Sequence, residues 1–192
     1  MNISPDDSLW YFFKKGDINA FKSLFKKYYP ILYAYGVKLT NAPDLTEDCL
    51  QNLFVYLWEN SESLGHVQNL KAYFFISFKR RLLKQVKQQY SRTSLSEYNG
   101  VKQEIAFSPQ EVAVKQEVQF LCTQTLHQLL NELPPREKEV IYLKYYCDMS
   151  TQEISGIMEI KPQSVLNILQ KAMIKLRKQS ENQIIAEILK KS

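Results

Sequence analysis

The sequence has little glycine and proline and no long uninterrupted hydrophobic run. Its 192 residues include only five glycines and seven prolines. Apolar residues recur at helical spacing along nearly the whole chain, and no stretch alternates as a β-strand would. The sequence therefore predicts an all-α protein. We expect neither a membrane span nor a signal peptide, because Asn2, Asp6 and Asp7 stand where a basic segment and an apolar run would be needed.

Cysteine and histidine are also scarce. The three cysteines, Cys49, Cys122 and Cys147, lie far apart within helical patterns, so they predict neither a metal clip nor a disulfide framework. Reduced core thiols of this kind indicate an intracellular, cytoplasmic location. The two histidines, His66 and His127, have no cysteine or carboxylate nearby at metal-ligand spacing.

Catalytic motifs are missing as well. The chain has no glycine-rich phosphate loop. The adjacent carboxylates Glu47 and Asp48 point to different faces of a predicted helix, so they make a poor acid–base pair. We therefore expect no catalytic residue, no metal and no cofactor, and we interpret the chain as a protein that is not an enzyme.

Hydrophobic and basic residues are plentiful by contrast. Hydrophobic residues make up 45% of the chain and aromatic residues 12%, which is enough for one large or two small packed domains. The net charge of +5 permits a polyanionic partner such as nucleic acid without requiring one.

Residues 133–178 predict a helix-turn-helix. Pro134 and Pro135 open a first helix, and Ser150 and Glu153 form a capping box at the start of a short second one. A third helix begins at Pro162. Apolar residues at helical spacing form the expected buried stripes: Val140, Leu143 and Cys147 in the first helix, Ile154, Ile157 and Met158 in the second, and Val165, Leu169, Ala172, Met173 and Leu176 in the third.

The opposite face of this third helix is polar, with amides near its start and cations toward its end. At 100° per residue it holds Gln163, Ser164, Asn167, Gln170, Lys171, Ile174, Arg177 and Lys178. Amides that reach base edges and cations that reach phosphates are the layout of a recognition helix in the major groove. A solvated face on an ordinary helical bundle is the alternative. The capping box, the short second helix and the tight connection at 159–161 favour DNA.

The N-terminal half predicts three amphipathic helices, over residues 17–36, 46–60 and 71–89, with a polar loop at 60–69. The third of these combines aromatic residues with six cations that no acid compensates. Cations displace phosphate counterions and rings stack with unpaired bases. The segment therefore favours a nucleic-acid surface over the alternative, a core helix with a solvated basic side.

Helical periodicity fails between residues 89 and 108, where small polar residues predominate. We interpret 89–108 as an interdomain linker. It would separate a helical domain at 1–88 from a second one at 109–192, in which a helix starts at Ser108–Pro109 and continues to Leu133.

Two segments carry more specific patterns. Residues 47–58, EDCLQNLFVYLW, have the form ED-L-Q-x-x-F-x-x-LW, and residues 129–176 contain LP-x-x-x-x-EVI, S-x-x-EI and A-x-x-x-L in order. The first resembles the polymerase-binding helix, and the second the fourth conserved region, of RNA polymerase sigma factors of the extracytoplasmic-function type. Glu159 stands where that family usually has a glycine in the turn, and Asn52 where a glutamate is common.

The resemblance implies a promoter-binding protein with sigma region 2 at 1–88 and region 4 at 109–192. Core RNA polymerase would bind Asp48, Gln51, Asn52 and Val55. The minus-ten element would be recognised and melted by His66, Asn69, Lys71, Tyr73, Phe74, Lys79, Arg80, Arg81 and Lys84. The minus-thirty-five element would be read by Lys161, Gln163, Ser164, Asn167, Gln170, Lys171 and Lys175. An anti-sigma partner, often membrane-anchored in this family, is also implied.

The function expected on this basis is that of a sigma factor, which binds core RNA polymerase and directs it to specific promoters. The alternative is a stand-alone helix-turn-helix regulator whose N-terminal module binds a ligand or dimerises. Such a regulator would bind duplex operator DNA without the polymerase.

Overall fold

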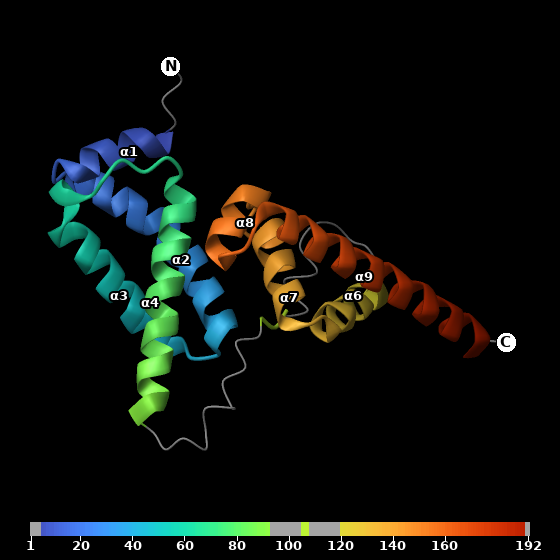
Figure 1. The fold of residues 1–192 in the computed structure, drawn as a ribbon. Coiled ribbons are helices and arrows are strands. Elements are labelled where there is room, and N and C mark those ends of the chain that lie inside the picture. Colours follow the sequence, from blue (N-terminus) through green and yellow to red (C-terminus); the bar gives the residue numbers. More distant parts are fainter. Residues whose placement is uncertain (1–4, 93–104, 108–119, 191–192) are drawn as a thin grey trace. The chain divides into compact units, whose positions relative to one another are not determined.

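The computed structural model describes residues 5–92, 105–107 and 120–190. Within these ranges every regular element is a helix, as the periodicity predicts, and the chain divides into two compact units, Met1–Gln103 and Glu104–Ser192 (Figure 1). The helix start predicted at Ser108 lies outside the described residues. No described helix is both long and apolar enough to cross a bilayer.

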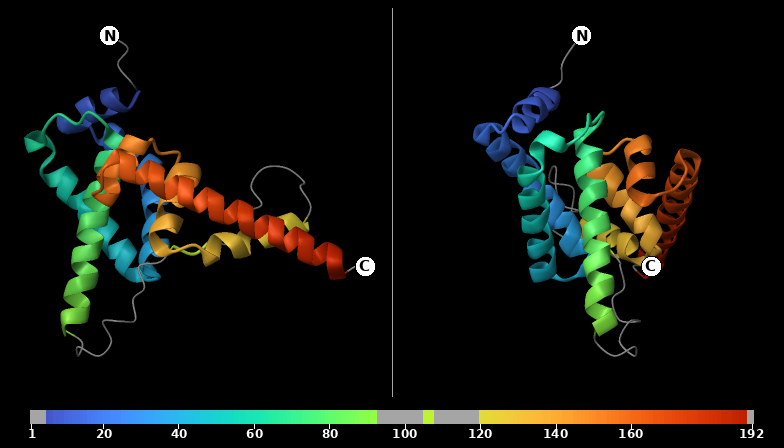
Figure 2. Two further views of the ribbon diagram at one scale, coloured as in Figure 1. Left: turned by 45° about the vertical axis from the view of Figure 1, so that its right-hand side comes forward. Right: turned by 60° about the vertical axis from the view of Figure 1, so that its left-hand side comes forward.

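Unit 1 contains α1 (Pro5–Lys14), α2 (Ile18–Thr40), α3 (Pro43–Glu59), the short 3-10 helix η1 (Ser61–Ser63) and α4 (Leu70–Arg92). Helices α2, α3 and α4 pack against one another, and α1 contacts α2, α4 and η1 (Figures 1 and 2). The core between them is rich in aromatic rings, which include Trp10, Phe13, Tyr28, Tyr35, Phe54, Phe74, Phe75 and Phe78. The periodicity did not predict α1, because its ten residues offer only Trp10 and Phe13 as buried apolar positions.

Helix α2 begins after Asp17, where it was predicted to begin. The Asp17 carboxylate accepts hydrogen bonds from the backbone N–H groups of Asn19 at 2.7 Å and Ala20 at 3.2 Å, so it caps the helix. The helix continues past its predicted end at Gly36 to Thr40. Gly36 is therefore an interior residue of α2 and does not end it.

Close packing explains the glycine at this interior position. A Cβ atom added to Gly36 would lie 2.6 Å from the side chains of both Phe78 and Thr46. Only a residue without a side chain lets α2 approach α3 and α4 this closely.

Unit 2 contains α6 (Phe120–Glu132), α7 (Pro135–Ile141), the π-helical turn η2 (Tyr142–Tyr146), α8 (Thr151–Met158) and α9 (Pro162–Lys190). Helix α9 packs against α6, α7 and α8 (Figure 2). The three helix starts predicted for the helix-turn-helix are confirmed. The prediction that Met173 is buried is wrong, since 47% of it is exposed, whereas Val165 and Ala172 are buried.

The segment predicted as a linker is shorter than expected at both ends. Helix α4 extends to Arg92, beyond the predicted start of the linker at residue 89. Ile105 and Phe107 are buried. The Phe107 backbone N–H donates to the Asn131 side chain at 2.9 Å, and its carbonyl accepts from that side chain at 3.1 Å. Residues 105–107 therefore belong to the packed structure of unit 2.

Two of the three cysteines fall on described side chains. Cys49 and Cys147 are buried thiols, as the sequence predicts for core cysteines. Burial raises the pKa of the Cys49 thiol to about 11, although the nearby Arg81 charge opposes this shift.

Candidate functional surfaces

Helix α3 has a polar face that is exposed on unit 1. The four residues expected to bind polymerase, Asp48, Gln51, Asn52 and Val55, are all exposed on it. Gln51 donates a weak hydrogen bond of 3.4 Å to Glu47, one turn earlier. An apolar side chain surrounded by amides and a carboxylate is the composition of a surface that can dock another protein.

Aromatic side chains border this α3 face on both sides. On one side, Phe25 of α2 packs against Phe54 with ring centroids 4.8 Å apart. On the other, the Arg81 guanidinium of α4 lies 4.2 Å from the centroid of the Tyr56 ring. The sequence predicts Arg81 only as a DNA contact, but this cation–π contact shows that it also joins α4 to α3.

The loop before α4 and the exposed side of α4 carry most of the predicted minus-ten residues. His66, Asn69, Arg80 and Lys84 are exposed, while Lys71 and Lys79 are half-exposed. Arg80 and Lys84 lie opposite the buried stripe of the helix, where both can reach an extended anion. Asn69 has a structural role too, because its side chain accepts a hydrogen bond of 2.8 Å from the Ala72 backbone N–H and so caps the start of α4.

Phe74 is not available for base stacking. Its ring is only 1% exposed and stacks on Tyr28, with centroids 4.4 Å apart and an angle of 16° between the ring planes. The expectation that Phe74 contacts DNA is therefore corrected, and we assign this residue to the core. The neighbouring Tyr73 stays half-exposed and contacts Trp10 of α1, with ring centroids 5.6 Å apart.

Both ends of α8 have a defined cap, and the second of them leads the chain into α9. Ser150 Oγ accepts from the Glu153 backbone N–H at 3.2 Å, and the Glu153 carboxylate accepts from the Ser150 backbone N–H at 2.6 Å, so the predicted capping box is present. At the other end of α8, Glu159 adopts a left-handed backbone conformation with φ of 54°. This conformation explains why a glycine is usual at that position in the family that the sequence resembles.

The start of α9 presents the predicted minus-thirty-five residues. Lys161, Gln163, Asn167, Gln170 and Lys171 are exposed, and Ser164 is half-exposed. The Gln163 side chain donates to the Asn167 side chain at 3.1 Å, which holds two amides in one orientation. Ordered amides on an exposed helix face are suited to bidentate contacts with the edges of bases.

Two features of α9 differ from a purely polar recognition face. Leu166 and Ile174 are 47% and 59% exposed, so they offer apolar surface beside the amides. Lys175 donates to Glu137 of α7 at 2.7 Å and thereby ties α9 to α7. No sequence pattern indicates this pairing, because the two residues are far apart along the chain.

Metal binding finds no support in the described part of the chain. Among the side chains that the structure describes, no group of three or more histidine, cysteine, aspartate or glutamate residues is placed to hold a metal ion.

Comparison with known proteins agrees with the helix-turn-helix. Residues 123–176 match the family model for sigma-70, region 4. A relative with similarity along most of the chain is RNA polymerase sigma factor YlaC of Bacillus subtilis (strain 168). It is 23% identical over 167 residues, which cover 83% of this chain and 91% of YlaC.

Solved structures share the fold. CnrH, solved in complex with the cytosolic domain of CnrY, is 17% identical with a TM-score of 0.59, and the match covers 93% of this chain and 99% of that chain. The sigma factor RpoE of Bartonella quintana, solved with the anti-sigma factor NepR, is 21% identical with a TM-score of 0.60, and the match covers 85% and 98% of the two chains. The region 4 match and the relative YlaC show that the chain is similar in sequence to RNA polymerase sigma factors, and the two solved structures show that it shares their helical fold.

Proposed function

We propose that this chain is an RNA polymerase sigma factor of the extracytoplasmic-function type, which directs core RNA polymerase to specific promoters and uses a separate surface for each contact. The exposed face of α3 would bind core polymerase, the loop at 64–69 with α4 would hold the melted minus-ten element, and the start of α9 would read the minus-thirty-five element. Unit 1 would act as sigma region 2 and unit 2 as region 4. None of these contacts requires chemistry by the chain itself.

The observation that carries the proposal is the arrangement of α8 and α9. A capped short helix, a tight turn and an exposed helix face with ordered amides lie within the segment that matches sigma-70 region 4. Exposed cations at Lys161 and Lys171 can neutralise phosphates beside the bases that the amides contact.

The exposed cations of α4 support the assignment of the minus-ten surface. Arg80 and Lys84 suit the backbone of an unpaired strand, and the half-exposed ring of Tyr73 can stack on a base. Phe74 lies in the core and contributes to this surface only by packing beneath it.

Two further inferences concern partners and location. Both solved structures contain a second protein, described as the cytosolic domain of CnrY and as the anti-sigma factor NepR. We infer that an anti-sigma protein, which a membrane anchor can tether, also masks this chain. Because core RNA polymerase is in the cytoplasm, we propose that this protein is also cytoplasmic.

The decisive experiment is run-off transcription. Purified core polymerase from the source organism is supplied with a genomic fragment library, with and without this protein, and discrete transcripts that depend on it are expected. Binding of duplex DNA without any binding of core polymerase would instead identify a stand-alone regulator. The comparisons do not favour that alternative, because the similarity to YlaC extends well beyond region 4.

Variants of the three surfaces separate their roles. Val55→Arg should abolish the polymerase complex, Arg80→Ala with Lys84→Ala should reduce strand opening measured by permanganate footprinting, and Asn167→Ala should weaken the minus-thirty-five contact. Tyr145→Ser, at a tyrosine that is 61% exposed outside these surfaces, is the matched control. Undiminished opening by the Arg80 and Lys84 variant would remove α4 from the proposal.

A further inference from the structure

Helix α1 and the loop before α4 form a groove whose α1 wall belongs to none of the three surfaces. Its volume is about 510 Å³, and its walls include Trp10, Tyr11, Phe12 and Lys14 from α1 with His66 and Val67 from the loop. A cavity of this size is in the range that accommodates a small organic group.

Two aromatic side chains of the groove are more than half exposed, although α1 packs on the core of unit 1. Tyr11 and Phe12 are 55% and 51% exposed, and their rings meet edge to face with centroids 5.5 Å apart. Exposure of large apolar rings to water is unfavourable, and a partner that covers the rings removes this cost. Trp10 is almost fully buried, and its indole N–H has no hydrogen-bond partner in the structure. This nitrogen is itself buried, so a ligand in the groove would contact the exposed Tyr11 and Phe12 rings and not this donor.

The charges around the groove are mixed, with cations in excess. Lys14 and Asp7 line it, and the Lys15 ammonium lies 4.8 Å from the centroid of the Tyr11 ring. An apolar slot with two lysines at its side fits a flat, neutral ring that is joined to an anionic backbone.

The groove is continuous with the proposed minus-ten surface. His66 belongs to both, and the Trp10 ring that lines the groove contacts Tyr73 of α4. Tyr73 and the Trp10 wall of the groove are therefore neighbours, so a strand bound at Tyr73 can extend into the groove.

We propose that this α1 groove binds an unpaired base of single-stranded DNA, which stacks on Tyr11 or Phe12 while Lys14 and Lys15 neutralise the adjoining phosphates. Helix α1 thus extends the path of the melted strand beyond the loop and α4. The inference rests on the proposed function, because it requires that unit 1 holds unpaired promoter DNA.

The test uses the full chain in complex with core polymerase. The probe is a fluorescein-labelled single-stranded DNA of mixed sequence, about twelve nucleotides long, a length within the range of known single-strand sites. Its affinity is measured by fluorescence anisotropy. Two variants alter the groove in opposite ways. Tyr11→Ser with Phe12→Ser removes the stacking rings, and Ser8→Trp, at another residue that lines the groove, fills it while the rings remain. Tyr145→Ser is the control for loss of an exposed tyrosine.

A second readout observes the groove directly. The chain has two tryptophans, so Trp58→Phe leaves Trp10 as the only indole. Its emission should change as single-stranded DNA is added and should saturate in the same concentration range as the anisotropy signal. In the background of Tyr11→Ser with Phe12→Ser, this change should disappear.

Both groove variants should lower the affinity for single-stranded DNA about tenfold, since one stacked base is lost, while polymerase binding and duplex binding stay unchanged. Affinities within about twofold of the unaltered protein would overturn the inference. If the Arg80 and Lys84 variant still weakens binding in that case, the proposed function stands and only the groove assignment fails. If the unaltered complex binds no single strand at all, both fail. Loss of polymerase binding in the groove variants would show instead that α1 contacts the polymerase.

Discussion

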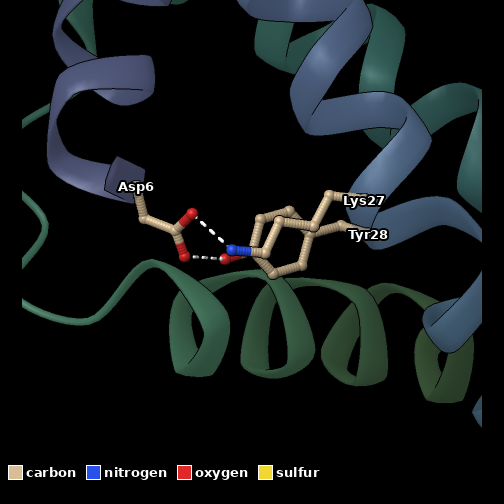
Figure 3. A network of polar contacts seen from close by, with 3 residues as sticks. All are labelled: Asp6, Lys27 and Tyr28. Atoms are coloured by element: carbon tan, nitrogen blue, oxygen red, sulfur yellow. Dashed lines mark hydrogen bonds and ion pairs between the residues drawn. The ribbon is translucent and has the colours of Figure 1, made fainter. Parts of the chain in front are cut away.

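The Tyr28 hydroxyl donates a hydrogen bond of 2.7 Å to the Asp6 carboxylate and so connects α2 to α1 (Figure 3). Lys27 forms an ion pair with the other oxygen of the same carboxylate. The ring of Tyr28 lies in the core, where it stacks on Phe74 of α4. One polar network therefore positions α1, whose rings form the proposed groove.

Removal of the Tyr28 hydroxyl tests the strength of this network. Tyr28→Phe keeps the stacked ring but removes one hydrogen bond to a charged acceptor, so the free energy of unfolding should fall by about 1.5 kcal/mol at neutral pH. Urea denaturation followed by tryptophan fluorescence reports unit 1, because both tryptophans lie there. In the Asp6→Asn background, where the charged acceptor is absent, the same substitution should cost clearly less. An equal cost in both backgrounds would show that the hydroxyl acts independently of Asp6.

The same carboxylate predicts a pH dependence. Partial burial alone would raise the pKa of Asp6, but hydrogen bonds from Lys27 and Tyr28 and the positive charges of Lys27 and Lys71 outweigh burial and hold the pKa below its ordinary value of 3.8. A group with a lowered folded-state pKa contributes stability above its unfolded pKa and loses it as the pH falls through the folded value. The unaltered protein should therefore lose stability faster below about pH 4 than Asp6→Asn, and the two curves should converge. Parallel curves over this range would contradict the assignment.

Gly36 predicts a packing effect that a second glycine can control. In Gly36→Ala the new methyl group would press on Phe78 and Thr46, which are both buried, so the free energy of unfolding should fall by about 1–3 kcal/mol. Gly65→Ala should change it by less than about 0.5 kcal/mol, because nothing lies within 4 Å of the added atom. Equal effects of the two substitutions in urea denaturation would mean that packing at Gly36 is not limiting.

Helical periodicity was sufficient to predict the elements with long apolar stripes, and it failed where the stripe is short or interrupted. Helices α2, α3 and α4 were all predicted, whereas the ten-residue α1 was missed. The π-helical turn at Tyr142–Tyr146 could not be foreseen either, because its hydrogen-bond pattern does not alter the spacing of Val140, Leu143 and Cys147. The burial of Ile105 and Phe107 had a signal, namely two apolar residues inside a polar stretch.

The candidate surfaces were predictable where exposure follows from periodicity. The exposed face of α3 and the amides of α9 lie where a spacing of 100° per residue puts them. The prediction that Phe74 contacts DNA was wrong. Leu70, Phe74 and Phe78 recur every four residues and are all buried, so helical spacing already indicated a core position. Contacts between distant segments, such as Arg81 with Tyr56 and the α1 groove, leave no local pattern and need the structure.

The capping box of α8 should control the local stability of the helix-turn-helix. Ser150→Ala removes the acceptor for the Glu153 backbone N–H and should destabilise α8 by about 1 kcal/mol. Amide hydrogen exchange of residues 151–158 measures this directly, and about fivefold faster exchange is expected. Gln152→Ala, at an exposed position whose side chain makes no capping contact, should leave exchange unchanged. Unchanged protection in Ser150→Ala would show that tertiary packing alone holds α8.

Two lysines of α9 should respond differently to the same substitution, since they differ in their partners. Lys171 is exposed on the recognition face, so Lys171→Gln should weaken binding to the promoter duplex and reduce the slope of log affinity against log salt by about 1, the value for one lost phosphate contact. Lys175 is paired with Glu137, so Lys175→Gln should leave that slope nearly unchanged and instead lower the stability of unit 2 by about 1 kcal/mol. Fluorescence anisotropy over a range of salt concentrations, together with hydrogen exchange of α7 and α9, separates the two effects. A reduced slope for Lys175→Gln without loss of stability would mean that Lys175 leaves Glu137 to contact phosphate, and it would return this residue to the minus-thirty-five surface.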